Sequence, residues 1–327
     1  MRGRRCPGGT RALMLAGTLA VVLAGVPIAV AAAPAAVAAS GAVASATPWW
    51  AWPLGLFVVC LVLGIVAIPA GVGGGVLFVP IVSGFFPFHL DFVRGAGLLV
   101  ALASALAAGP SLLKSGLADL RLALPLALFA SVSSIGGAMI GLALPPNVVQ
   151  TALGVTILAL VALMSLAKKS ERPGVARPDA LAAALRIHGV FRDAASGRDV
   201  AWQVHRTALG LTLFAIIGAL AGMFGLGAGW ANVPALNLVM GAPLKIAAGT
   251  SSFILSLVDS AAAWVYLNRG AVLAPVAVPS VIGMMVGARI GARLLGVLPA
   301  ATVRRLVLLL LLLAGARALF KGLGLWN

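Results

Sequence analysis

A glycine-proline motif occurs twice in this chain, each time inside a hydrophobic stretch. The first copy, GVGGGVLFVP, runs from Gly71 to Pro80, and the second, GLGAGWANVP, runs from Gly225 to Pro234, an offset of 154 residues. Further matches at this offset are Gly64 with Gly218, Gly73 with Gly227, Gly75 with Gly229, Val79 with Val233, Gly116 with Gly270 and Pro125 with Pro279. We interpret the chain as an internal duplication. A membrane segment broken at the same place in each half is typical of a transporter site at a repeat interface.

Composition indicates a membrane protein. Hydrophobic residues make up 62% of the chain and charged residues only 9%, which is typical of membrane spans. The net charge of +16 is interpreted as basic residues holding cytoplasmic ends on the inner face, so no nucleic-acid partner is expected. Neither cysteine, Cys6 or Cys60, has metal-ligand spacing, and the three histidines are dispersed. We therefore predict no disulfide, metal site or cofactor, and no enzymatic activity.

The pattern of polar and apolar residues divides the chain into four parts. They are a leading segment (1–47), a first transmembrane repeat (48–167), a basic linker (168–206) and a second transmembrane repeat (207–327). The leading segment has the basic, apolar, small-residue order of a secretory signal. Its apolar stretch exceeds the usual ~7–15 residues, so an uncleaved anchor helix is the alternative. Either way, the chain near Trp49 is expected outside the cytoplasm.

Each half contains five apolar segments. They lie at about 52–70, 76–87, 94–112, 122–144 and 147–167, and at about 207–224, 230–241, 246–267, 272–295 and 301–320. A full span takes about 20 residues, so the segments after the glycine motifs are predicted to be half-helices or re-entrant pieces. The linker is rich in arginine and lysine and should be cytoplasmic. It folds either as a small hairpin or as a flexible tether.

These features predict an all-α, multi-pass protein of the cell membrane with two homologous helical repeats. Five crossings between an external Trp49 and a cytoplasmic linker would give the repeats inverted topology. Each repeat would open with a glycine-broken helix.

The broken helices offer a binding site for a small anion. Glycine lets the chain leave helical geometry and expose backbone N–H groups, and a half-helix that begins there directs its dipole at the same point. The alternative is that the glycines permit close helix packing. The residues expected to hold the substrate are Gly71, Gly73, Gly74, Gly75, Pro80, Gly225, Gly227, Gly229, Asn232, Pro234, Thr250, Ser251 and Ser252.

Several motifs together resemble the sulfite exporter TauE/SafE family. They are the G-x-GGG-x4-P motif of Gly71–Pro80 with its second copy, the AAGTSS stretch of Ala247–Ser252, the Y-x3-G of Tyr266–Gly270 and the GARIGARL run of Gly287–Leu294. The resemblance covers about residues 50–320 and implies a transporter of sulfite, sulfonates or related sulfur anions. The second copy of the motif departs from the first at Ala228, which replaces Gly74. Hydroxyl contacts to substrate are expected mainly from the second half.

Asp259 is the one acidic residue that we place inside a span. An intramembrane carboxylate usually faces a cavity or a partner. Asp259 is therefore expected either to carry a proton that couples anion movement to the proton gradient or to form an ion pair with Arg289. Arg94 and Lys245, which each open a span, are interpreted as interfacial anchors. The competing function is a membrane scaffold or assembly partner, although a scaffold has no need of duplicated helix breaks.

The charge of the linker generates a test of topology. A reporter enzyme that is active only outside the cytoplasm, fused at Arg192, is expected to be silent, because the basic linker should stay on the inner face. The same reporter fused at Trp49 serves as the positive control. Strong activity of the Arg192 fusion would overturn the proposed orientation.

Overall fold

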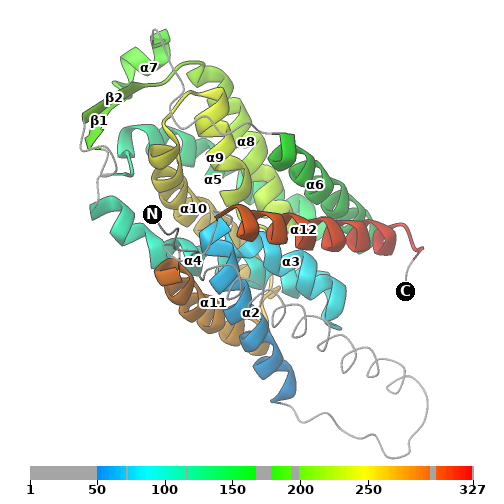
Figure 1. Ribbon diagram of the computed structural model, residues 1–327. Helices are drawn as coiled ribbons and strands as arrows, with labels where there is room; N and C mark the ends of the chain where they lie inside the picture. Colours follow the sequence, from blue (N-terminus) through cyan, green and yellow to red (C-terminus); the bar gives the residue numbers. More distant parts are fainter. Residues whose placement is uncertain are drawn as a thin grey trace, which may run out of the picture.

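Helices form most of the part of the chain that the structure describes. The computed structural model describes residues 50–70, 73–114, 117–166, 178–192, 199–294 and 300–325. The first half contains α2 (Ala51–Ala70), α3 (Gly74–Phe85), α4 (Leu90–Lys114), α5 (Leu120–Ala143) and α6 (Pro146–Leu166). The second contains α8 (Thr207–Phe224), α9 (Gly229–Pro234), the π-helix η1 (Ala235–Val239), α10 (Leu244–Asn268), α11 (Ala274–Leu294) and α12 (Ala300–Gly322) (Figure 1). The leading segment and Gly71 lie outside the described residues.

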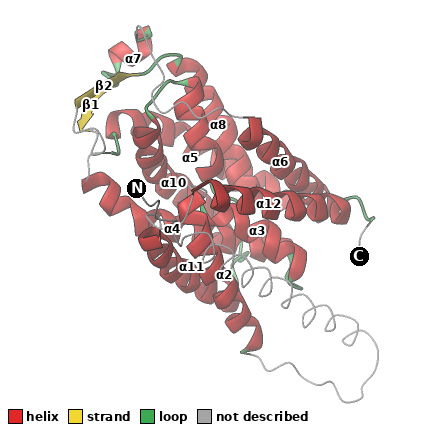
Figure 2. Cartoon of the chain, in the orientation of Figure 1, coloured by secondary structure: helices red, strands yellow, loops and turns green. Residues whose placement is uncertain are grey.

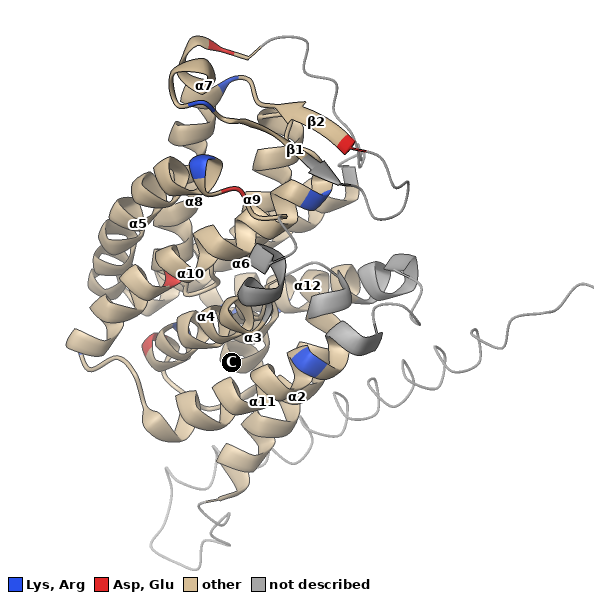
Figure 3. Cartoon of the chain, turned by 90° about the vertical axis from the view of Figure 1, so that its left-hand side faces the viewer, with Lys and Arg blue, Asp and Glu red and all other residues tan. Residues whose placement is uncertain are grey.

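Six of the described helices are long and apolar enough to cross a membrane. They are α4, α5, α6, α8, α10 and α11. Segments coloured for charged residues are sparse along the described helices in Figure 3. The prediction of an all-α protein with several membrane spans is confirmed, and the orientation of those spans stays a prediction.

The segments that follow the glycine motifs form short helices. The helix α3 has 12 residues, and α9 has six before it continues into the five-residue η1. Pro234 has no N–H to donate to the preceding turn, and the hydrogen bond from the Met240 N–H to the Ala235 carbonyl (3.1 Å) spans five residues. A π-helical turn therefore follows Pro234. π-Helical turns are rare in proteins, and those that occur are often at functional sites.

The two halves pack against each other through equivalent contacts. A Cβ atom placed on Gly64 of α2 would lie 2.8 Å from the Met284 carbonyl oxygen of α11. A Cβ atom on Gly218 of α8 would lie 2.2 Å from the Ala130 carbonyl oxygen of α5. Gly218 follows Gly64 by 154 residues, and Met284 follows Ala130 by the same 154 residues. The same backbone contact thus occurs twice with the halves exchanged, which supports the interpretation of the halves as repeats.

The helices α4 and α10 cross in the interior and run in opposite directions. Gly227 lies between them, because a Cβ atom there would be 2.8 Å from the Ala101 Cβ and 3.1 Å from the Asp259 Oδ2. The Arg94 guanidinium also lies 5.9 Å from the ring of Tyr266. Arg94 precedes Ala101 on α4 by seven residues, whereas Tyr266 follows Asp259 on α10 by seven, so the two helices are antiparallel. These two helices enclose the backbone of the second break.

The linker forms a small folded cap. It contains α7 (Ala180–Ala184) and the antiparallel strands β1 (His188–Arg192) and β2 (Asp199–Gln203), seen as the hairpin in Figure 2. The Asp179 carboxylate accepts hydrogen bonds from the Thr207 N–H (3.0 Å) and hydroxyl (2.7 Å) at the start of α8. Of the two alternatives for the linker, the structure forms the hairpin, and Asp179 ties the start of α7 to the start of α8.

Candidate functional site

The two glycine breaks meet at one point. A Cβ atom placed on Gly229 would lie 3.6 Å from the Gly73 Cα, and one placed on Gly73 would lie 3.9 Å from the Gly229 Cα. Leu255 of α10 contacts both positions, with its Cδ1 3.3 Å from the Gly229 Cβ position and its Cδ2 3.8 Å from that of Gly73. The start of α3 and the start of α9 are thus brought face to face.

The two breaks have different backbone geometry. In the second, Gly225 and Gly227 have φ angles of +70° and +72°, which L-residues rarely adopt. In the first, Gly73 has φ −61° and ψ 144°, an ordinary extended conformation, and caps the N-terminus of α3. Gly73 therefore does not use the positive φ that glycine permits. A Cβ atom at Gly73 would make only ordinary van der Waals contacts, so its lack of a side chain instead leaves the start of α3 open.

Other motif glycines pack tightly. A Cβ atom on Gly74 would lie 2.7 Å from the Met284 Sδ, and one on Gly75 would lie 2.6 Å from the Leu226 carbonyl oxygen. Gly74 and Gly75 therefore serve close packing, the alternative role considered for these glycines. Pro80 and Pro234 lie inside α3 and at the end of α9, where each removes one backbone donor.

Asp259 faces the second break from α10. The residue is fully buried, and neither carboxylate oxygen has a hydrogen-bond partner among the described residues. The backbone N–H of Ala228 faces the carboxylate but falls short of hydrogen-bond geometry. Ser251, Leu255 and Asp259 recur every four residues, so they share one face of α10. Leu255 of this face contacts both breaks, and Asp259 lies against the second.

Asn232 is a second buried polar residue without a partner. Neither its amide nitrogen nor its amide oxygen forms a hydrogen bond within the described structure, and the side chain is fully buried in α9. Its backbone N–H bonds to the Ala228 carbonyl (3.2 Å), so Asn232 lies one helical turn beyond the residue that Asp259 faces. Buried polar groups without partners are rare in native proteins and call for a ligand, water or ion.

The three hydroxyl residues predicted to contact substrate, Thr250, Ser251 and Ser252, are only partly brought to the two breaks. The Thr250 Oγ1 accepts a hydrogen bond from the Asp119 N–H (3.1 Å) and fixes the loop before α5. The Ser252 hydroxyl donates to the Ala248 carbonyl (3.2 Å) within its own helix. Ser251 is buried, and both Ser251 and Ser252 lie within one helical turn of Leu255 on α10.

The ion pair between Asp259 and Arg289 does not form in the described structure. Arg289 is exposed on α11, which packs along α2, with a Cβ atom on Gly287 lying 2.1 Å from the Leu61 carbonyl oxygen. Asp259 lies instead beside the second break. Two roles were considered for Asp259, a proton carrier and an ion-pair partner. A carboxyl group without a fixed countercharge fits the first of them better.

Arg94 is buried, so its interpretation as an interfacial anchor is wrong. Its side chain is 1% exposed. The guanidinium donates hydrogen bonds to the carbonyl oxygens of Gly141 (3.0 Å) and Met223 (2.9 Å) and pairs with Asp91. These carbonyls belong to the last turns of α5 and α8, which are left without partners inside the helix. The sequence signal was a basic residue that opens a span after a broken segment, as Lys245 also does, but the two carbonyl partners of Arg94 come from distant segments.

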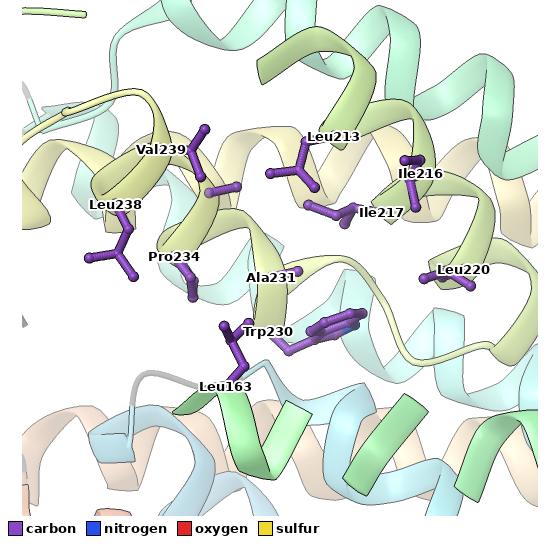
Figure 4. A pocket seen from close by; sticks show the side chains of 11 residues that line it. Leu163, Leu213, Ile216, Ile217, Leu220, Trp230, Ala231, Pro234, Leu238 and Val239 are labelled. Carbon is purple, nitrogen blue, oxygen red and sulfur yellow. The ribbon is translucent and has the colours of Figure 1, made fainter. Parts of the chain in front are cut away.

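A separate apolar pocket of about 290 Å³ lies on the outer side of α9. Figure 4 shows Trp230 and Pro234 of α9 facing Leu213, Ile216 and Ile217 of α8 across it. Its lining contains no charged residue, so it does not suit an anion. The buried polar residues Asn232 and Asp259 are not among those that line it.

Multi-pass membrane proteins with two broken helices meeting inside the protein form a class of transporters. The chain belongs to the sulfite exporter TauE/SafE family, whose sequence pattern matches residues 55–318. It is also similar to the probable membrane transporter protein YunE of Bacillus subtilis (strain 168), with 25% identity over 284 residues that cover 82% of this chain and 98% of that relative. No solved structure matches the chain. The resemblance inferred from the motifs is confirmed, and the protein is a membrane transporter.

The different geometries of the two breaks can be separated by substitution. Gly227→Ala is expected to destabilise the protein by about 1–2 kcal/mol through its positive φ, with a further cost from the contact with Ala101. Gly73→Ala should fold normally, because its φ suits alanine and no atom lies closer than 3.8 Å. It should nevertheless lower transport roughly tenfold to a hundredfold, because the methyl group displaces a ligand held between the breaks.

Thermal unfolding in detergent and uptake into liposomes measure the two effects. Gly136→Ala on α5 is the matched control, because a Cβ atom there meets nothing within 4 Å. Unimpaired transport by a well-folded Gly73→Ala protein would contradict a substrate site at this contact.

Proposed function

We propose that the protein moves a small sulfur oxyanion, namely sulfite, a sulfonate or a related anion, through the point where the two glycine breaks meet. The observation that carries this proposal is the contact between Gly73 and Gly229, together with two buried polar side chains that have no hydrogen-bond partner among the described residues: Asn232 on α9, three residues after Gly229, and Asp259, which lies against Gly227. The residues come from α3, α9 and α10, so the site depends on both halves of the chain.

The start of α3 suits an anion. The first N–H groups of a helix have no partner within it, and the helix dipole places partial positive charge at this end. Gly73 leaves this end without a side chain, so that an oxyanion can approach the backbone closely. Asn232 adds an amide that can donate two hydrogen bonds. Together these groups can replace the water lost when an anion enters the membrane interior.

The sulfur chemistry of the substrate is supported by the family. Its printed description names sulfite export, and the relative in Bacillus subtilis is described only as a probable membrane transporter. The site is consistent with this substrate class, because backbone N–H groups and an amide bind oxygen atoms of an oxyanion. No fixed cation is required at the site, so binding can remain weak enough for release.

Asp259 gives the site a means of coupling to protons. An ionised carboxylate that is buried without a partner is costly, and an anion bound nearby would add like-charge repulsion. Both costs disappear when the carboxyl group holds a proton. Anion and proton are therefore expected to occupy the site together, so that a proton gradient can drive anion movement.

Replacement of Asp259 by asparagine tests this coupling. Asp259→Asn keeps the size and polarity of the side chain but cannot load a proton. It is expected to abolish anion accumulation driven by a pH gradient in liposomes and to preserve exchange of sulfite at equal pH. The measurement is uptake of radiolabelled sulfite with and without the gradient.

Asp199→Asn provides the matched control, since Asp199 is exposed on β2 of the cap. This variant should accumulate sulfite as the unchanged protein does. Full gradient-driven accumulation by a folded Asp259→Asn protein would rule out Asp259 as the coupling group, and absence of sulfite transport by the unchanged protein would contradict the proposed substrate.

A further inference from the structure

Leu255 is an apolar side chain that packs against both breaks. It is 5% exposed, and its two methyl groups approach the Cβ positions of Gly73 and Gly229 to 3.8 and 3.3 Å. The buried polar residue Asp259 lies one helical turn further along the same face of α10. One face of α10 therefore presents a polar group, Asp259, to the second break and an apolar side chain, Leu255, to both breaks.

The other half provides an internal comparison. Ala101 of α4 precedes Leu255 by 154 residues. It contacts Gly75 and Gly227, at 2.9 and 2.8 Å from their Cβ positions, and these glycines are the equivalents of Gly229 and Gly73. The two crossing helices thus each place one side chain against both breaks. One of these side chains is a methyl group and the other is an isobutyl group.

We propose that Leu255 determines which oxyanions the transporter accepts, by limiting the size of the substituent attached to the charged group. This inference rests on the proposed function. A sulfonate has an oxyanion head and an organic tail, and the head needs the polar groups on α3 and α9. The tail then has to occupy the space that Leu255 fills. The structure accordingly assigns the site to sulfite and to sulfonates with very short tails.

The smaller side chain at the equivalent position shows what the backbone tolerates. Ala101 sits at the same kind of crossing as Leu255, so alanine is compatible with this geometry. Leu255→Ala removes apolar volume between the breaks without altering a polar group of the site. The space released should admit a longer tail and leave recognition of the oxyanion head unchanged.

Competition assays measure this selectivity directly. Uptake of radiolabelled sulfite into liposomes is inhibited with unlabelled sulfite or with propanesulfonate, and the ratio of the two half-inhibitory concentrations is compared between variants. In Leu255→Ala the ratio is expected to shift toward propanesulfonate by about tenfold or more. This is the discrimination that roughly one methylene group produces in an apolar pocket. A ratio does not depend on how much protein folds, so general destabilisation would not produce the shift.

Two further variants make the result decisive. Leu257→Ala makes the same chemical change two residues away, where the side chain is 40% exposed on the outer face of α10, and it should leave the ratio unchanged. Leu255→Val removes a single methylene group, so it should shift the ratio in the same direction even if Leu255→Ala fails to fold.

The outcomes separate the two proposals. Sulfite uptake with an unchanged ratio in both Leu255 variants would overturn the role of Leu255 and leave the proposed function standing. An equal shift in Leu257→Ala would also overturn it. Failure of the unchanged protein to take up sulfite would contradict the proposed function itself and the inference that rests on it.

Discussion

Interrupted helices inside a bilayer are stable only when the protein satisfies their freed backbone groups. Here Arg94 meets this requirement at the end of α8, where its guanidinium binds the Met223 carbonyl and also the Gly141 carbonyl of α5. The Tyr266 hydroxyl donates to the Gly222 carbonyl (3.0 Å) and lies near that of Met223 (3.3 Å). A cation at two helix C-termini also complements their dipoles. The backbone can therefore leave helical geometry at Gly225 without exposing unpaired carbonyls to lipid.

The duplication repeats the backbone but not the side chains. Equivalent glycines make equivalent interhelical contacts in the two halves. In contrast, the buried polar residues Asn232 and Asp259 correspond at the 154-residue offset to Phe78 and Ala105. The first half thus supplies a helix N-terminus and the close approach of Gly73, while the second supplies the polar chemistry. An asymmetric site of this kind can hold one anion and one proton within an otherwise symmetric packing arrangement.

Much of the architecture could be predicted from the sequence because hydrophobic length and paired glycines are local signals. The short helices α3 and α9 with η1 begin within two residues of the predicted segments, and the breaks lie face to face. That Asp259 does not pair with Arg289 could not be predicted, since sequence order made Arg289 on the next span the obvious candidate, whereas α11 packs along α2. Side-chain partners of Arg94 and Thr250 depend on which helices of the opposite half are neighbours. Hydrophobic periodicity contains no such information.

The central claim is that the substrate occupies the contact between the two breaks. Selenite has the shape and charge of sulfite, and its selenium atom can be located by anomalous diffraction in crystals of the full chain. The account predicts one strong anomalous peak beside Gly73 and Gly229, within hydrogen-bonding distance of Asn232. The protein used should transport selenite, and the crystals should be saturated with it. A peak found only elsewhere, such as among the arginines of the cap, would then contradict the account.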